Sequence, residues 1–476
     1  MVMKFLYRYR SIEKILKYKE LKNLSIYFSK LNELNDQMED YMNIVWQGDE
    51  IAFQGLFKHY LYTLTKVYYE AFIRNIDKKI DFDKLPIFLS TNILKLNEIK
   101  TIFKSIYYKF FSPQFIDSIP KKLAQSNKKF TADEILLILK SIHFYAYSVI
   151  NTEMQQYVKE INFLKDKENN KKYYEVKSWK EYYEIIDLLI SNSYSKKKVL
   201  REINQFNSQY KFSKTNVNDR NKDINTYNTE VLFFDFPDLY IKDIKRLLYN
   251  NFCVVCFSKT FRNEPLWAHY ANNENGICLR YKIRQDKSFN YIDLNYPSEL
   301  HMYKKRNKIK RTLKKYKLNK VIYSDNYPEI DFFTSLGCFP RSILEDFWLT
   351  NYDKTQFSSC LQHYNNKEWY NNYHKKATEY ICTKSKNWKY EKEYRIFETE
   401  AIFNGYEKSQ SRIAQYKFDD LDSIIFGRKV SIEDKKKIIK IINRHCTKNK
   451  VNNLKFYDLY HSTISKRLEL KNVFVS

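Results

Sequence analysis

The chain has 476 residues, of which 43% are hydrophobic and 17% aromatic, so it can bury a sizeable core and is not a disordered protein. Glycine (6) and proline (8) are scarce, which disfavours all-β folds that need many tight turns. The formal charge of +27 favours anionic ligands and nucleic acid, but a chain this rich in Lys and Asn also carries positive charge as compositional background.

The cysteines and the apolar runs indicate the cellular compartment of the protein. Cys253 and Cys256 are spaced like half of a zinc site, but no second Cys/His pair follows, and they lie in the apolar run Phe252–Phe257. We therefore expect them to be buried strand residues. The N-terminal residues lack the apolar core of a signal peptide, and no run approaches the ~18 apolar residues of a membrane span. These features predict a reduced, cytoplasmic protein with no membrane partner.

The first forty residues predict a compact strand–helix–strand unit. Lys4–Tyr9 alternates like a strand, and Ser11 is placed to cap a helix over Glu13–Leu21. Leu24–Ser29 predicts a second strand, which ends in the polar turn Asn32–Asp36.

A different pattern occupies residues 41–250. Apolar residues recur at helical spacing in three segments, Gln54–Ile73, Ala132–Leu164 and Trp179–Ile190. We interpret this block as a large helical insertion whose charges form a solvated face.

Strand character returns after residue 250. The pattern predicts strands at Phe252–Ser258, Gly276–Tyr281, Glu391–Phe397, Ser423–Phe426 and Leu454–Tyr457. It predicts helices at Pro265–Tyr270, at Trp369–Lys384, at Ile432–Ile442 after the cap Ser431, and a strongly basic helical segment at Lys304–Lys320. We therefore expect an α+β fold in which residues 1–40 and 251–465 form one split core domain, with a mixed sheet built from both ends of the chain.

Several widespread catalytic motifs are missing. The six glycines, at positions 48, 55, 276, 337, 405 and 427, form neither a P-loop nor a dinucleotide-binding fingerprint. The sequence also lacks a serine flanked by the glycines of a nucleophile elbow, and an HExxH zinc pair. Most common ATPases, dehydrogenases, hydrolases and metalloproteases are excluded on this basis.

Eight short segments together carry a resemblance to a known family. They are Leu6–Ser11, Ile26–Ser29, Leu34–Glu39, Cys256–Ser258, Leu266–Tyr270, Asn275–Leu279, Trp388–Arg395 and Ile424–Gly427. In this order the chain resembles the bacterial "domain of unknown function 2971" family over residues 4–40 and 252–435, with Trp-x-His-Tyr and Glu-x-Glu-Tyr-Arg as the most specific pieces. Gln37 stands where the family usually has proline. Members tend to occur near mobile elements and phage-defence genes, so the resemblance implies a role in antiviral defence.

A second resemblance concerns chemistry. Leu6–Ser11 is similar to the opening strand of ADP-ribosyltransferases, including toxin types, with Arg8 in the His/Arg place and Glu391 or Glu393 as the late-strand glutamate. Cleavage of the nicotinamide–ribose bond of NAD develops positive charge on the ribose, which a carboxylate stabilises. An arginine fork holds phosphate or ribose, and an aromatic ring stacks on nicotinamide. No glycine loop is needed, which agrees with the glycine content.

The resemblance assigns the following candidate residues. Glu393 would stabilise the ribosyl cation, Glu391 or His269 would prepare the acceptor, and NAD as substrate would contact Arg8, Tyr9, Ser258, Trp267, Tyr270 and Arg395.

Most candidates also have a structural interpretation. Tyr9 alternates as a strand residue should and can simply pack, and Arg8, taken alone, is better interpreted as surface-exposed. Trp267 and Tyr270, three apart on a helix, can be core residues, and His269 can be a hydrogen-bonded structural histidine. Glu391 and Glu393 would share one strand face, where they can form a salt-bridge ladder or, in a cleft, raise one another's pKa. Asn35 is best interpreted as a turn cap, whereas the roles of Asp36 and Glu39 stay open.

The sequence thus predicts an NAD-dependent ADP-ribosyltransferase or NAD glycohydrolase that acts as a toxin-like effector in phage defence. Its expected partners are NAD, a nucleic-acid or protein acceptor and a neighbouring defence-system protein. One alternative is a metal-dependent nuclease that uses Asp36, Glu39, Glu391 and Glu393 as ligands. The other is a non-enzymatic protein that senses a phage component through the helical insertion.

Overall fold

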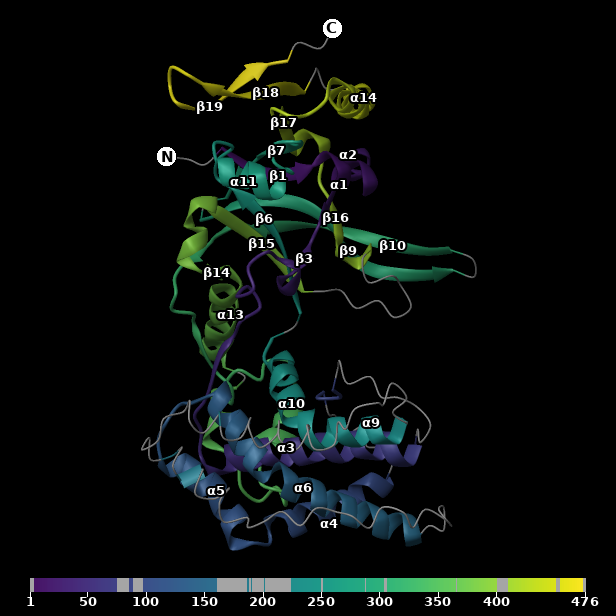
Figure 1. Ribbon diagram of the computed structural model, residues 1–476, viewed down its shortest axis with the longest axis vertical. Helices are drawn as coiled ribbons and strands as arrows, with labels where there is room; N and C mark the ends of the chain where they lie inside the picture. Colours follow the sequence, from purple (N-terminus) through teal and green to yellow (C-terminus); the bar gives the residue numbers. More distant parts are fainter. Residues whose placement is uncertain are drawn as a thin grey trace. The chain divides into compact units, whose positions relative to one another are not determined.

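The computed structural model describes residues 4–74, 85–88, 97–160, 186–187, 190, 201, 224–249, 251–286, 288–303, 306–364, 366–399, 410–450 and 454–473. The chain is an α+β protein and divides into two compact units (Figure 1). Unit 1 comprises Met1–Tyr41, Asn250–Pro328 and Ala377–Ser476, and unit 2 comprises Met42–Tyr249 and Glu329–Lys376. The division differs from the expected one at residues 329–376, which we placed in the 251–465 core but which belong with the inserted block.

Unit 1 is built on a large mixed sheet. Its strands, in spatial order, are β11 (Asn319–Lys320), β15 (Glu393–Thr399), β6 (Phe252–Ser258), β1 (Phe5–Ser11), β7 (Gly276–Lys282), β17 (Leu421–Phe426), β18 (Lys455–Ser462) and β19 (Arg467–Asn472), with β3 (Ser29–Lys30) also pairing with β6. Segments from both ends of the chain therefore lie side by side in one sheet, as the sequence predicted.

The two faces of this sheet have separate cores. Leu6, on one face of β1, packs with α1 (Ile12–Lys17), α2 (Glu20–Asn23) and α14 (Ile432–Asn449). Tyr9, on the opposite face, packs with α11 (Glu264–Tyr270). The alternation of β1 therefore places Arg8 and Arg10 on the side of α1, α2 and α14.

Side-chain caps fix where these helices begin. Ser11 accepts from the Lys14 amide at 3.3 Å, Asn263 from the Leu266 amide at 3.3 Å, and Ser431 from the Asp434 amide at 3.1 Å. The helix starts expected at Ser11 and Ser431 are thus confirmed, and β6 has the predicted bounds.

The strands β1 and β6 part from one another along their length. They pair only at Tyr7 and Ser258, whereas β1 pairs with β7 and β6 with β15 over their whole lengths. Further along, β3 pairs with β6 at Ser29–Val254. Between these two points, no strand in the described part of the chain pairs with the β1-facing edge of β6, which leaves a gap in the sheet.

A second sheet of unit 1 corrects one prediction. Its order is β10 (Arg306–Lys317), β9 (Asn290–Tyr303), β16 (Ile413–Gln415) and β2 (Ser25–Tyr27), with β8 (Arg284–Gln285) on β9. The prediction of a helix at Lys304–Lys320 was wrong, because β10 is a strand of a long hairpin. Its lysines and arginines favour a helix locally, but pairing with β9 and burial of Tyr316 against Phe28 and Tyr296 override that preference.

The remaining elements of unit 1 are short. They are η1 (Leu31–Glu33), β12 (Ile322–Tyr323), β14 (Thr383–Lys384), η7 (Lys386–Glu391), η8 (Gln410–Arg412) and η9 (Phe418–Asp420). The helix α13 (Lys367–Cys382) precedes β14, which pairs in parallel with β12.

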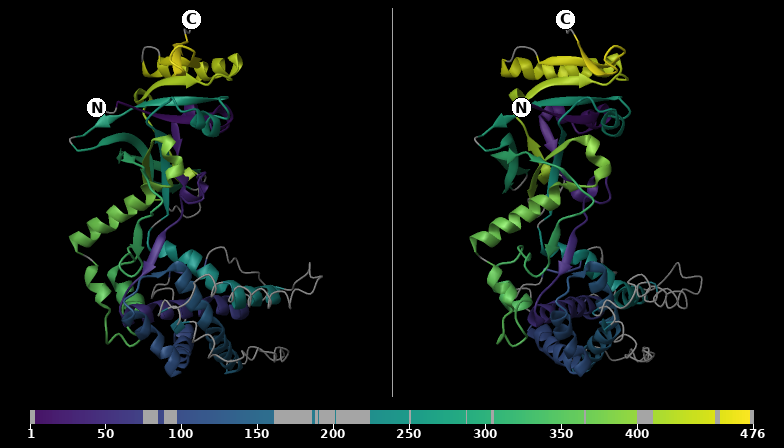
Figure 2. Two further views of the ribbon diagram at one scale, coloured as in Figure 1. Left: turned by 60° about the vertical axis from the view of Figure 1, so that its left-hand side comes forward. Right: turned by 90° about the vertical axis from the view of Figure 1, so that its left-hand side faces the viewer.

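Unit 2 is mainly helical (Figure 2). It contains α3 (Glu50–Tyr69), η2 (Glu70–Arg74), α4 (Asn97–Phe111), α5 (Gln114–Gln125), α6 (Ala132–Glu160), α9 (Ile224–Glu230), η3 (Val231–Asp235), α10 (Phe236–Ile244), η4 (Lys245–Leu247), α12 (Arg341–Ile343), η5 (Leu344–Trp348) and η6 (Ser359–His363), with the small sheet β13 (Glu329–Asp331), β4 (Asn43–Trp46) and β5 (Phe130–Thr131). The helix expected at Trp179–Ile190 lies outside the described residues, apart from Ile186, Asp187 and Ile190.

Among the helices that the structure describes, one has the length and composition of a membrane span. Ala132–Tyr157 of α6 passes that test, but 72% of its apolar window is buried inside the protein. This is the environment of a core helix in a soluble protein.

Candidate active site

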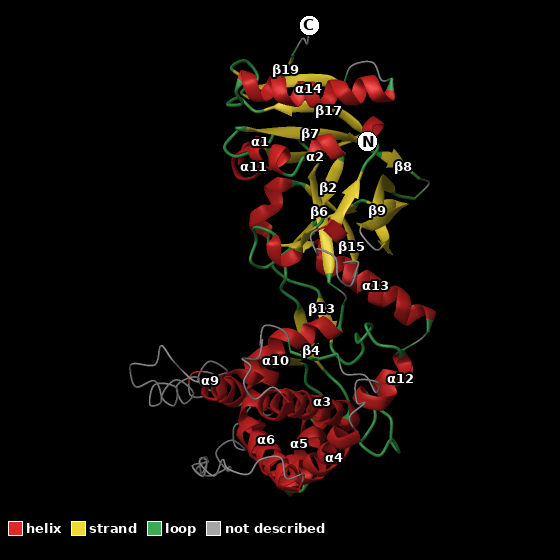
Figure 3. Cartoon of the chain, turned by 90° about the vertical axis from the view of Figure 1, so that its right-hand side faces the viewer, coloured by secondary structure: helices red, strands yellow, loops and turns green. Residues whose placement is uncertain are grey.

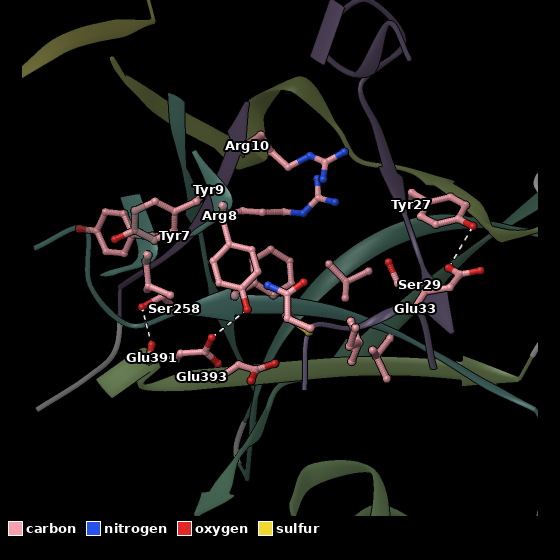
Figure 4. Close-up of a pocket in the computed structure, with 18 of the residues that line it drawn as sticks. Tyr7, Arg8, Tyr9, Arg10, Tyr27, Ser29, Glu33, Ser258, Glu391 and Glu393 are labelled. Carbon is pink, nitrogen blue, oxygen red and sulfur yellow. Dashed lines mark hydrogen bonds between the residues drawn. The ribbon is translucent and has the colours of Figure 1, made fainter. Parts of the chain in front are cut away.

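A cavity of about 200 Å³ lies at the gap between β1 and β6. It is lined by Tyr7–Arg10 of β1, Val254–Ser258 of β6, residues of the segment from Tyr27 to Glu39, and Lys384, Glu391 and Glu393. Where neighbouring strands diverge, backbone groups that a sheet would otherwise pair can bind a ligand. Figure 4 shows Arg8 and Arg10 on one side of the cavity, with Glu391 and Glu393 across from them.

The arginine side of the cavity carries excess positive charge. Arg8 Nη1 donates to Glu20 Oε2 at 3.4 Å, and Arg10 donates from Nε to the same oxygen at 3.0 Å and from Nη2 to Oε1. Two guanidiniums thus share one carboxylate, which leaves one positive charge uncompensated. Burial, followed by the neighbouring charge of Arg8, lowers the pKa of Arg10. We call Arg8, Arg10 and Glu20 the cationic end.

Arg8 is well placed to bind an anion. It is 8% exposed, and within the described residues its side chain has no recorded hydrogen bond other than that to Glu20. A guanidinium has five N–H donors, so most of the donors of Arg8 are left for a ligand.

The opposite side of the cavity holds a buried cluster of three glutamates and two cations. Glu391 and Glu393 reach it from consecutive elements, because Lys392 between them adopts a left-handed conformation with φ of 48° that joins η7 to β15. We expected Glu391 and Glu393 on one strand, which was wrong, since Glu391 ends η7. This turn nevertheless brings both carboxylates to the cavity.

Arg395 and Lys384 bind these carboxylates. Arg395 donates to Glu393 Oε1 at 2.8 Å and Oε2 at 3.1 Å, and to both oxygens of Glu39 at 2.7 Å. Lys384 Nζ lies 2.8 Å from Glu391 Oε2, 3.0 Å from Glu39 Oε1 and 3.4 Å from Glu393 Oε2. When all five groups are ionised, three carboxylates meet two cations, so this group carries one excess negative charge. We call it the anionic end.

The two cavity-lining carboxylates titrate differently. Burial is the largest influence on Glu391 and raises its pKa, Lys384 opposes this, and the charge of Glu393 reinforces it. Burial also opposes ionisation of Glu393, but Arg395 and then Lys384 outweigh it and hold the pKa of Glu393 at about 2. Glu393 is therefore ionised at neutral pH, and Glu391 is the residue of the pair that is suited to gain and lose a proton.

Tyr270 and Ser258 orient Glu391. The Tyr270 hydroxyl donates to Glu391 Oε1 at 2.8 Å, and the Ser258 hydroxyl donates to the Glu391 carbonyl at 2.8 Å (Figure 4). Both residues line the cavity. Tyr9 also lines it, although its hydroxyl donates to the Thr260 carbonyl at 2.8 Å and its ring meets Trp267 edge-on at 5.1 Å.

Three predicted site residues do not line the cavity. Trp267 is fully buried behind Tyr9, and its indole donates to the Phe261 carbonyl at 2.8 Å. Arg395 is fully buried and binds Glu39 and Glu393, so it supports a carboxylate rather than reaching a ligand. His269 is exposed and its ring faces Trp388.

The candidate site also contains residues that were not predicted from the sequence. Arg10 and Glu20 complete the cationic end, and Lys384 lies between the glutamates of the anionic end. The alternation of β1 signals Arg10, because it falls on the same strand face as Arg8. No local signal marks Lys384 among the 83 lysines and arginines.

The turn after η1 contains Asp36 and Glu39, whose roles the sequence left open. Asp36 accepts from the Met38 amide at 3.0 Å and caps this turn, whereas Asn35 lines the cavity and Glu39 joins the anionic end. No group of three or more His, Cys, Asp or Glu side chains in the described residues has the arrangement of a metal site.

Comparison of the chain with protein-family models, with curated proteins and with solved structures finds no match. The family resemblance stays a prediction that rests on the sequence segments that carry it.

Proposed function

We propose that unit 1 binds NAD in the cavity between β1 and β6 and cleaves its nicotinamide–ribose bond, as an ADP-ribosyltransferase or an NAD glycohydrolase. The observation that carries the proposal is the cavity's pairing of a cationic end with an anionic end. NAD has matching opposite charges, on its diphosphate and on its pyridinium ring. At about 200 Å³ the cavity is smaller than the roughly 300–1,000 Å³ of typical small-molecule sites, so it would take the nicotinamide riboside portion and adjoining phosphate.

Each residue of the cavity has a role in this chemistry. Arg8 and Arg10 bind phosphate oxygens, and the ionised Glu393 stabilises positive charge on the ribose. When the C–N bond breaks, its electron pair leaves with nicotinamide. The acceptor's oxygen or nitrogen then bonds to the ribose carbon, and its proton passes to Glu391, which Tyr270 and Lys384 hold in place.

The biological setting is proposed on separate grounds. The seven cysteines all lie within the described residues and none is in a disulfide bond, which is consistent with a reducing cytoplasm. The family resemblance supports a toxin-like effector in phage defence, with a nucleic-acid or protein acceptor and a neighbouring defence protein as partners.

The nuclease alternative makes different use of the same carboxylates. Glu39, Glu391 and Glu393 are already bound by Lys384 and Arg395, and Asp36 caps its own turn, so these groups are poorly available to a divalent cation. A nuclease would lose activity with a chelator, whereas the proposed chemistry would not.

The test is release of nicotinamide from NAD by the purified protein, with and without nucleic acid and cell lysate, and with and without a chelator. Chelator-resistant release is expected, and the additive that stimulates it identifies the acceptor class. Absence of release under every condition would contradict the proposal. A non-enzymatic sensor would keep its biological activity after substitution of Glu393.

A further inference from the structure

The two most basic segments of unit 1 differ in how their charge is balanced. On β10, Lys310 pairs with Glu299 at 3.1 Å, Lys314 with Glu398 at 2.8 Å, and Lys315 with Asp286 at 3.7 Å. Three of the cations on β10 thus have acidic partners.

The helix α14 carries cations without such partners. Residues 435–450 contain no Asp or Glu. Lys435 pairs with Asp458 and Lys437 with Asp434, but no acidic partner is recorded, within the described residues, for the remaining cations of the helix, Lys436, Lys440, Arg444 and Lys448. All four are exposed.

Their spacing places these four cations in one row. Each lies four residues from the next, so successive members are neighbours on the helix surface. At 1.5 Å per residue the row extends about 18 Å along the axis, and it slants around the helix by roughly 120°. On the opposite side of α14, Ile438, Ile442 and Cys446 are buried in the core of unit 1. Figure 3 shows α14 lying beside β17 of the main sheet. The row is therefore a fixed, outward-facing line of charge.

A linear row of this length suits a polyanion with regularly spaced charges. A small anion needs donors that converge on one point, which an extended row does not supply. A helix that inserts into a membrane surface needs a free apolar side, and that side of α14 is buried. A nucleic-acid strand carries one charge per ~3.4 Å of helix axis, so about five phosphates match the row.

We propose that the α14 surface, defined by Lys436, Lys440, Arg444 and Lys448, binds the sugar–phosphate backbone of a nucleic acid. This surface lies on the side of the main sheet that holds the cationic end. His445 Nε2 of α14 contacts the Leu21 carbonyl of α2 at 3.0 Å, and α2 carries Glu20. The proposal does not depend on NAD chemistry.

The test compares two triple variants that each remove three positive charges. One is Lys436→Gln with Lys440→Gln and Lys448→Gln on α14. The matched control is Lys310→Gln with Lys314→Gln and Lys315→Gln on β10. Binding to a short DNA duplex and to a single-stranded RNA of unrelated sequence is measured by fluorescence anisotropy over a salt series, and thermal unfolding checks that both variants fold.

The expected result is a weaker salt dependence for the α14 variant. For the duplex, the slope of log K against log salt should fall in magnitude by about 2.7, which is three phosphates at ~0.9 each. The β10 variant should keep the native slope. Equal effects of the two variants, no binding by the native protein, or preferential binding of the native protein to phosphatidylserine vesicles would overturn the proposal. NAD cleavage without added nucleic acid should not change in either variant, so the outcome is separable from that of the NAD assay.

Discussion

The two ends of the cavity bury charge in opposite ways. At the cationic end, Arg8 and Arg10 share Glu20, and all three residues come from adjoining elements near the N-terminus. At the anionic end, Glu39, Glu391 and Glu393 surround Lys384 and Arg395. Glu39 is distant in the sequence from the other four residues, which all lie between positions 384 and 395. Each end keeps one charge beyond what its internal partners neutralise. A ligand that supplies the opposite charge at both ends would stabilise both.

The largest expected effect is a loss of stability when Arg395 of the anionic end is replaced. Arg395→Met would leave Glu39 and Glu393 buried with only Lys384 to compensate them. Breaking a buried ion pair from one side typically costs about 3–5 kcal/mol in the free energy of unfolding. Denaturant unfolding would measure the loss. Arg428→Met, which removes an exposed pair with Glu274, is the control and should cost less than about 1 kcal/mol. Comparable losses in the two variants would contradict the role given to Arg395.

Substitution of Glu393 should affect turnover most strongly. Glu393→Gln removes the carboxylate that faces the developing charge but keeps its shape, so nicotinamide release should fall by about 10²–10³. Glu398→Gln on the same strand is a matched control, because Glu398 pairs with Lys314 and does not line the cavity. Retention of full activity by a folded Glu393→Gln protein would show that this carboxylate has no catalytic role.

At the cationic end, Arg8→Gln should weaken substrate binding more than catalysis. A hydrogen bond to a charged group is worth about 1.5–3 kcal/mol, so KM for NAD should rise roughly ten- to hundredfold with a smaller change in kcat. Arg280→Gln on the adjacent strand is the control, because Arg280 pairs with Asp422 and does not line the cavity. Should kcat fall while KM stays constant, Arg8 would act on the reaction rather than on phosphate binding.

The smallest effect is a displacement of the pH profile. Because the pKa of Glu391 is raised, activity that needs its ionised form should be lost, as pH falls, at a pH above the ordinary value of 4.5 for a glutamate. Lys384 lowers this pKa, so Lys384→Met should move the acid limb to higher pH. The pH dependence of kcat/KM is the measurement. Glu391→Gln should remove this limb, and an unmoved limb in Lys384→Met would separate Lys384 from the titrating group.

Much of the fold could be predicted from local patterns. The apolar run that begins at Phe252 and the cap at Ser431 identified β6 and the start of α14, because both signals lie within a few residues. The hairpin strand β10 could not be predicted, since its pairing with β9 outweighs the local preference of its lysines for a helix.

The residues of the cavity could likewise be predicted only in part from the sequence. Arg8, Glu391 and Glu393 could be selected because short motifs contain them. Lys384 could not be found, because its importance comes only from the folding that brings Glu39 and Glu391 around its ammonium group.

The most direct test of the two-ended cavity is a calorimetric comparison of NAD with NADH as ligands of the native protein. Both carry the same diphosphate, but only NAD has a positively charged nicotinamide ring. We predict that NAD binds more tightly than NADH, and that Arg8→Gln weakens the binding of both ligands while Glu393→Gln reduces the preference for NAD. Equal affinity for the two ligands, or no binding of either, would contradict it.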